Sequence, residues 1–139
     1  MPQPVQTAID EALDDEFRAE AFYAAVIAAH GDIRPFVNII EAEKRHAAML
    51  DAVLTTYGLA APANPYLDGT KPALEAPATI AEACKAGVAA EIANRDLYDD
   101  NLIPAAAGYP DVIAVFEALR DASQNNHLPA FQRCVARYS

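Results

Sequence analysis

The sequence has 139 residues, 53 % of them hydrophobic, and only 5 glycines; this length suits a single domain over residues 1–139, and the alanine-rich composition favours helices over a sheet. The 20 acidic and 10 basic residues give a net charge of −10, which argues against nucleic acid and an anionic membrane surface as partners. Because no stretch is apolar enough to span a bilayer and residues 1–4 lack the pattern of a signal peptide, a cytoplasmic location is expected.

Hydrophobic periodicity predicts four helices, at about residues 6–30, 33–57, 79–103 and 110–137. The first helix should stop at Gly31, and Asp32 is the expected N-cap of the second, with Pro35 in its first turn. Because only a few residues connect these two helices, we expect them to be antiparallel neighbours.

The segment after the second helix contains several prolines and shows no regular periodicity, which predicts a long crossover over residues 59–78. Thr79 and Glu82 have the spacing of a capping box at the start of the third helix, and Pro104 is expected to end that helix. In the fourth helix, Pro129 removes one backbone hydrogen bond, so a bend is expected just after His127.

Each predicted helix carries polar side chains within its apolar stripe. Glu43 and His46 are three residues apart, so they project to the same side of the second helix, among the residues expected to face the core. The inward-facing polar residues of the four helices are Glu16 and Glu20, Glu43 and His46, Glu91, and Gln124 and His127. Counting from the short loops places them within about one turn of a common level. Buried charge is costly unless it is paired or coordinates a metal, so this convergence indicates a metal site.

These residues resemble the ferritin-like superfamily, most closely its rubrerythrin-type branch together with ferritin-like domains of unassigned function. The similar segments are Glu16 to Tyr23, Phe36 to His46, Gly87 to Glu91 and Asn126 to Phe131. The resemblance implies an all-α, antiparallel four-helix bundle with a long crossover between the second and third helices. It also implies a non-haem di-iron centre, held by one Glu from each of two helices and a Glu-x-x-His pair from each of the other two.

Carried over, the resemblance makes Glu16 and His46 ligands of one metal, Glu91 and His127 ligands of the other, and Glu43 a bridge. The departure is Gln124, which stands where the second Glu-x-x-His pair would have its carboxylate. A neutral amide is a poor bridge between two cations, so a weakened second site or a single metal is an alternative. Three carboxylates also leave one positive charge of two divalent ions to be balanced by hydroxide, peroxide or Glu20.

Tyr23 and Tyr98 lie one to two turns from Glu16 and Glu91 and are expected to donate hydrogen bonds to the carboxylates. For Glu20, a salt bridge at the edge of the bundle is favoured over a role as a ligand. For Cys84 and Cys134, two buried thiols are favoured over a disulfide.

The expected cofactor is iron, as one or two ions, with manganese or zinc as alternatives. The expected chemistry is oxidation of Fe(II) by O2 or peroxide, or iron handling. The alternative is a metal-free ferritin-like scaffold that acts as a binding or interaction protein, in which Arg95 and Arg120 turn inward and pair with the carboxylates. Metal ions and O2 or peroxide are thus the expected partners, and a homodimer stays an open alternative.

Overall fold

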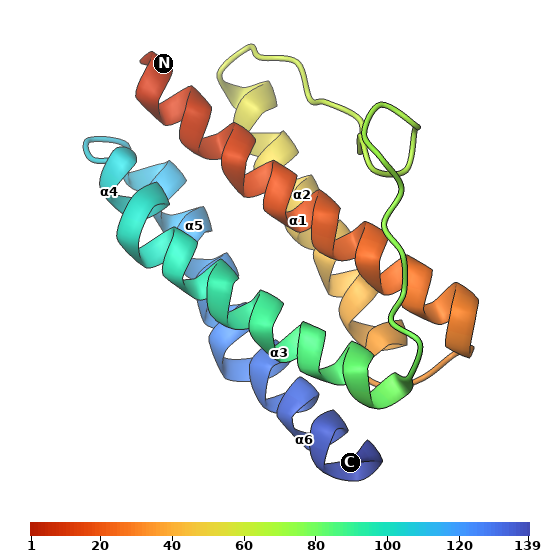
Figure 1. Ribbon diagram of the computed structural model, residues 1–139. Coiled ribbons are helices and arrows are strands. Elements are labelled where there is room, and N and C mark those ends of the chain that lie inside the picture. Colours follow the sequence, from red (N-terminus) through yellow and green to blue (C-terminus); the bar gives the residue numbers. More distant parts are fainter.

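The computed structural model, which describes residues 1–139, contains helices and loops but no strands. The helices are α1 (Gln3–His30), α2 (Phe36–Thr56), α3 (Ile80–Leu97), α4 (Ile103–Ala105), α5 (Pro110–Ala122) and α6 (Leu128–Tyr138). Two π-helical segments, η1 (Tyr98–Leu102) and η2 (Ser123–His127), join α3 to α4 and α5 to α6 without a break. The chain therefore forms four long helical rods, and the expected all-α class and four-helix bundle are confirmed (Figure 1). None of the helices is both long and apolar enough to cross a membrane.

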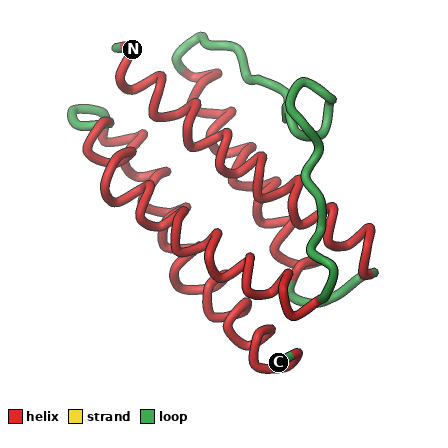
Figure 2. The backbone as a smooth tube through the Cα atoms, viewed as in Figure 1, coloured by secondary structure: helices red, strands yellow, loops and turns green.

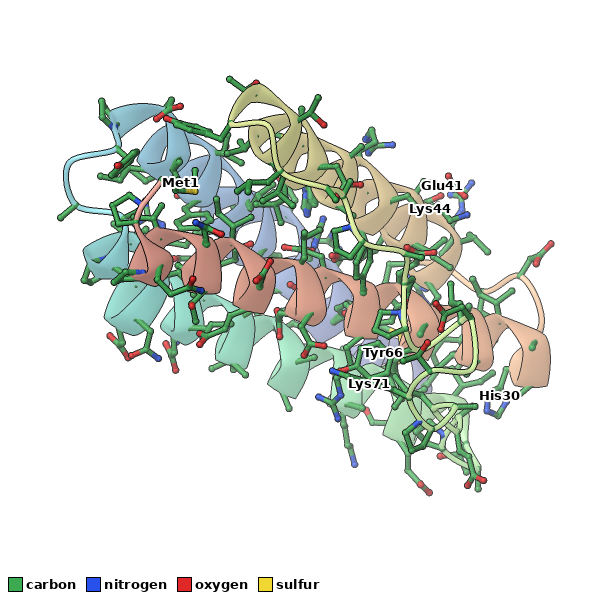
Figure 3. The ribbon with its side chains drawn as sticks, turned by 90° about the horizontal axis from the view of Figure 1, so that it is seen from above. Met1, His30, Glu41, Lys44, Tyr66 and Lys71 are labelled. Carbon is green, nitrogen blue, oxygen red and sulfur yellow. A yellow bond between two sulfur atoms is a disulfide. The ribbon has the colours of Figure 1, made fainter.

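The rods pack in pairs, α1 with α2 and α3 with α6, and the two rods of each pair run in opposite directions (Figure 1). The loop of residues 57–79 passes along the outside of α1 on its way to α3 (Figure 2). Asn64 Nδ2 donates to the carbonyl oxygen of Phe17 at 3.0 Å, and the Tyr66 hydroxyl and Lys71 Nζ donate to Asp14 Oδ1 at 2.9 and 2.7 Å (Figure 3). The crossover is thus fixed to α1 by side chains from both segments.

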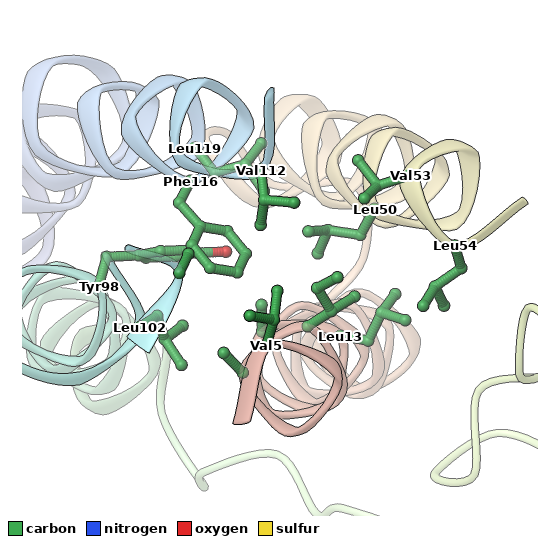
Figure 4. Packing of buried hydrophobic residues seen from close by; sticks show 14 of the residues in the cluster. Val5, Leu13, Leu50, Val53, Leu54, Tyr98, Leu102, Val112, Phe116 and Leu119 are labelled. Carbon is green, nitrogen blue, oxygen red and sulfur yellow. The ribbon is translucent and has the colours of Figure 1, made fainter. Parts of the chain in front are cut away.

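The apolar core has two parts. The larger cluster fills the end of the bundle that contains the α1 N-terminus and includes Leu13, Leu50 and Phe116 (Figure 4). The smaller cluster fills the other end and includes Phe36 and Phe131, whose ring centroids are 5.2 Å apart. In the second, third and fourth rods the buried acidic and imidazole side chains occur between the segments that supply these two clusters, and in α1 Glu16 lies beside Phe17, the last residue that this helix gives to the larger cluster. A polar layer therefore crosses the bundle at mid-height.

The helix boundaries differ from the expected ones where prolines act. The second helix begins at Phe36, and Asp32 makes no capping hydrogen bond, because Pro35 occupies the N-cap position and helical geometry starts only after it. The expected cap of the third helix is present, since Thr79 Oγ1 accepts a hydrogen bond from the backbone N–H of Glu82 at 3.1 Å.

The third rod does not end at Pro104 as expected, because helical structure continues to Ala105. The fourth rod stays helical on both sides of Pro129, and the bend expected just after His127 stays a prediction. Each of Pro104 and Pro129 is the second residue after a π-helical segment. Proline lacks an N–H donor and crowds the carbonyl group of the preceding turn, and the wider π turn accommodates it. Each π segment also adds a residue to its rod and so rotates the face that points inward.

The two cysteines form a disulfide between α3 and α6, with a Cα–Cα distance of 5.6 Å. The expectation of two buried thiols is therefore wrong in this structure. Cys84 and Cys134 lie at facing positions of two antiparallel rods, each about two helical turns from the polar layer. The bond thus ties together the two rods that carry Glu91 and His127.

Candidate metal centre

All five expected ligands lie in the polar layer at the centre of the bundle. Each is almost completely buried, with exposed fractions of 2 to 8 %. They are Glu16 from α1, Glu43 and His46 from α2, Glu91 from α3, and His127 from η2. The helical spacing that predicted their convergence is realised, because they fall on the inward faces of regular helices, except for His127, which follows a π turn.

Glu43 lies at the middle of two sets of potential ligand atoms. One set consists of Glu16, Glu43 and His46, and the other of Glu43, Glu91 and His127; within each set one atom per residue lies within 4.8 Å of the others. The two carboxylate oxygens of Glu43 are divided between the sets, since Oε2 is 3.8 Å from His46 Nδ1 and Oε1 is 3.2 Å from His127 Nδ1. One shared carboxylate therefore stands between two separate groups of donors.

The remaining distances make the two sets nearly equivalent. His46 Nδ1 is 3.4 Å from Glu16 Oε2, and His127 Nδ1 is 3.4 Å from Glu91 Oε1. The two imidazole rings are stacked, with centroids 5.4 Å apart and planes 18° from parallel. Each set thus offers one imidazole nitrogen, one carboxylate of its own and one oxygen of Glu43.

Two buried tyrosines donate hydrogen bonds to the unshared carboxylates, as expected, but each does so across the bundle and not to the carboxylate of its own rod. The Tyr98 hydroxyl donates to Glu16 Oε1 at 3.1 Å, and the Tyr23 hydroxyl donates to Glu91 Oε1 at 2.9 Å. Burial raises the pKa of both phenols well above 10, and the nearby carboxylates raise it further. The tyrosines therefore remain protonated and act only as hydrogen-bond donors to the carboxylates.

Gln124 does not reach the centre, contrary to expectation. Its side chain is exposed, and Ser123 lies on the inward face instead. The Ser123 hydroxyl donates to Glu91 Oε2 and is 3.3 Å from the backbone carbonyl oxygen of Glu91. The cause is the π turn, which places Ser123 rather than Gln124 on the same side as His127. Pro129, two residues after this turn, was the sequence signal for it.

The pairing of arginines with the central carboxylates, which was the alternative to metal binding, is absent. Arg95 Nε pairs with Asp96 at 3.1 Å, and Arg120 Nη1 pairs with Asp99 at 2.9 Å, all on the outside of the bundle. Glu20 is half-buried and makes no ion pair, so the salt bridge expected for it is also absent. The two imidazoles are therefore the basic groups that face the carboxylates of the centre.

Besides Ser123, two polar residues beside the centre were not identified from the sequence. Asn94 Nδ2 donates to Asp15 Oδ2, and burial raises the pKa of Asp15 to about 6 even though this hydrogen bond acts to lower it. Asn94 lies three residues after Glu91, so helical spacing could have placed it on the same face. Asp15, next to Glu16, carried no such signal.

In the protein alone, protons hold the central carboxylates together. Burial and the charge of Glu43 raise the pKa of Glu16 to about 8. Burial disfavours both imidazolium ions, yet attraction to the adjacent carboxylates outweighs it and raises the pKa of His46 to about 9 and that of His127 to about 10. Burial likewise opposes ionisation of Glu43, but its interactions with Glu16, His127 and His46 hold its pKa below the usual value. A metal ion would have to displace these protons to bind.

The donor atoms fit divalent metal ions. His127 Nδ1 is buried and has no hydrogen-bond partner, although carboxylate oxygens lie 3.2 and 3.4 Å away. A buried polar atom without a hydrogen-bond partner is costly, and a metal ion bound at this nitrogen would remove the cost. Imidazole nitrogens with carboxylate oxygens are ligands that Fe(II), Mn(II) and Zn(II) accept. The centre therefore has the donors for one ion in each set, with Glu43 between them.

No family model, curated protein or solved structure matches this chain at significant similarity. The features that bear on function are accordingly those of the centre: its donor atoms, its burial and the hydrogen bonds around it.

Proposed function

We propose that this chain is a metal-binding protein of the non-haem iron type, with a ferritin-like bundle that holds up to two divalent ions. Glu16 and His46 would bind one ion, Glu91 and His127 the other, and Glu43 would bridge them. The observation that carries the proposal is the pair of buried Glu–His sets that share Glu43. The histidine nitrogen without a hydrogen-bond partner adds to it.

When bound, a pair of iron ions supplies the electrons for reduction of O2 or peroxide, or is itself the material that the protein handles. The chain orients the metal ligands and carries the protons that the ions displace. The Tyr98 hydroxyl fixes Oε1 of Glu16, which leaves Oε2 directed towards His46. Glu91 is held at both oxygens, by the Tyr23 hydroxyl at Oε1, the oxygen that also faces His127, and by the Ser123 hydroxyl at Oε2. The protons on Glu16 and on the two imidazoles leave as ions enter, so metal uptake should release protons.

The charge of the loaded centre follows from its residues. Three carboxylates face two divalent ions, and Ser123, which stands in the remaining position, is neutral. One positive charge is therefore left, and an anion such as hydroxide would balance it. This deficit favours a centre that keeps a position open for a small exogenous ligand over one that is closed and purely structural.

Elemental analysis of protein purified without a polyhistidine tag tests the proposal directly. Two ions per chain support the complete centre, one ion supports a single site, and none would support the metal-free scaffold instead. The same measurement separates iron from manganese and zinc. Consumption of O2 or peroxide on addition of Fe(II) then separates an oxidoreductase from an iron-handling protein.

The cytoplasmic location stays a prediction, and the disulfide gives a reason to test it. Stable disulfides are more common in oxidising compartments than in the cytoplasm of most cells. Titration of free thiols in protein extracted under thiol-trapping conditions would show whether Cys84 and Cys134 are bonded in the cell.

A further inference from the structure

A cavity of about 470 Å³ lies between α1, α3 and the crossover loop. Glu43 and Glu91 line its inner end and are each 3 % exposed, whereas Ala90 and Ala93 on its wall are open to solvent. The cavity therefore leads from the surface to the side of the centre where Glu91 lies. Its volume falls in the range of small-molecule sites, about 300 to 1,000 Å³.

The walls of the cavity are mainly apolar. Successive turns of α3 present Ala86, Ala90 and Ala93, and α1 presents Ala19 and Phe22 opposite them. Small side chains on one wall and an aromatic ring on the other leave room for an apolar body between the helices. A hydrated metal ion would gain nothing from such walls, so we expect an organic occupant.

The charged groups that line the cavity are mostly acidic. They are the carboxyl groups of Asp15, Glu43, Glu75 and Glu91 and the guanidinium group of Arg18. Arg18 is exposed and makes no ion pair, so solvent screens it at the rim. The chain as a whole carries a net charge of −10. This potential favours a cation over an anion.

Asn94 supplies an unused hydrogen-bond acceptor in the same cavity. Its residue is only 7 % exposed, and Oδ1 is buried without a hydrogen-bond partner. The orientation of the amide is fixed, because its Nδ2 donates to the carboxylate of Asp15 and a carboxylate oxygen can only accept. Oδ1 is thereby left without a hydrogen bond, because no group of the chain donates to it.

We propose that this cavity binds a small primary amine with an apolar body. An ammonium group has three donors and no acceptor, so it can pair with the carboxylate of Asp15. Asn94 Oδ1 is itself covered, and a small shift of its side chain would let it accept a hydrogen bond from the same ammonium group. The apolar body would lie against the alanines of α3 and against Phe22. Asn94 and Asp15 do not belong to the proposed metal ligands, so amine binding does not require a loaded centre. The test of amine binding is therefore independent of the test of metal binding, although the cavity would bring the amine beside Glu91.

Isothermal titration calorimetry with 2-phenylethylamine tests this proposal, on both the protein as purified and the chelator-treated protein. The matched probes are 2-phenylethanol, which is neutral, and 3-phenylpropanoate, which is anionic. We expect the amine to bind at least ten-fold more tightly than either probe. Ala90→Phe should abolish the binding by filling the cavity, whereas Ala118→Phe, at an exposed position of α5 outside the cavity, should leave it unchanged.

Asn94→Leu, which keeps the approximate volume but removes the acceptor, should reduce the affinity for the amine to that for the alcohol. Circular dichroism of each variant checks that the bundle is folded. Equal binding of amine and alcohol to the wild type would overturn the recognition of the cation. Tighter binding of the carboxylate, or amine binding that survives Ala90→Phe in a folded protein, would overturn the proposed site.

Discussion

Replacement of Glu43 by Gln is the most informative change in the centre, because this residue belongs to both sets of donor atoms. The amide keeps the shape of the side chain but removes the charge and one of the two acceptor oxygens. Loss of a group that only orients a ligand already costs about 10- to 100-fold in metal affinity. Loss of a shared ligand should cost more than about 100-fold at each of two sites, so Glu43→Gln should carry no metal after dialysis.

Two matched substitutions test the two sets of donor atoms separately. Glu16→Gln should weaken only the ion shared with His46, and Glu91→Gln only the ion shared with His127. Glu41→Gln is the control, since Glu41 lies on the same helix but is exposed and pairs with Lys44 at 3.3 Å (Figure 3). It should bind metal as the wild type does.

Elemental analysis after dialysis against metal-free buffer, followed by calorimetric titration with Mn(II) as a probe that resists oxidation, measures these effects. The decisive pattern is loss of both ions in Glu43→Gln and of one ion in each of the other two central variants. If Glu43→Gln retained one ion at wild-type affinity, Glu43 would not be a bridge, and the reasoning from its two divided oxygens would be wrong.

The remaining predictions concern stability and protons. The pKa values of both central histidines are raised from 6.5, to about 9 and about 10, so around neutral pH these two groups hold more protons in the folded metal-free protein than in the unfolded chain. Their contribution to the free energy of unfolding should be fully present below about pH 6.5 and be lost as the pH rises towards 10. Thermal unfolding in chelator across this pH range checks the prediction. Metal affinity should rise over the same pH range, because each ion displaces protons from its ligands. Titration of the metal-free protein with metal in weakly buffered solution would show the released protons as a fall in pH. Tyr98→Phe, which removes the 3.1 Å hydrogen bond to Glu16, should cost about 1 to 3 kcal/mol in free energy of unfolding, with Tyr138→Phe as the exposed control. Gly87→Ala would place Cβ 2.5 Å from the ring of Phe131 and should destabilise the protein by about 1 to 3 kcal/mol in denaturant unfolding, whereas an unchanged midpoint would mean that α3 and α6 separate easily. Reduction of the α3–α6 disulfide, which closes a loop of 50 residues, should lower the free energy of unfolding by about 2 to 4 kcal/mol, as unfolding with and without reductant would show.

The regular part of the bundle was predictable because helical spacing alone decides which residues share a face. Glu43 and His46 are three residues apart on an uninterrupted helix, and Glu16 and Glu91 also lie on regular helices, so their inward direction followed from the sequence. The four rods and the long crossover followed from the same periodicity and from the prolines between residues 59 and 78.

The failures occur where spacing is not the deciding factor. Gln124 was expected to face inward on a regular helix, but the π turn adds a residue and places Ser123 there. The alternative in which Arg95 and Arg120 pair with the central carboxylates could not be decided from helical phase, because their long side chains can also reach the acidic partners that they have on the surface. The disulfide depended on the distance between two rods, which the sequence does not contain.

Stability alone does not explain the polar layer at the centre of the bundle. Apolar side chains of similar volume are often as stabilising as a buried ionic cluster, or more so, and the apolar clusters above and below the layer show that this bundle packs well without charges. Selection for stability alone would therefore fill the layer with residues such as leucine. Five buried ionisable groups, with two tyrosines fully buried to orient them, are instead what the proposed metal site requires. The same reasoning predicts that replacing all five by apolar residues would stabilise the bundle and remove metal binding together.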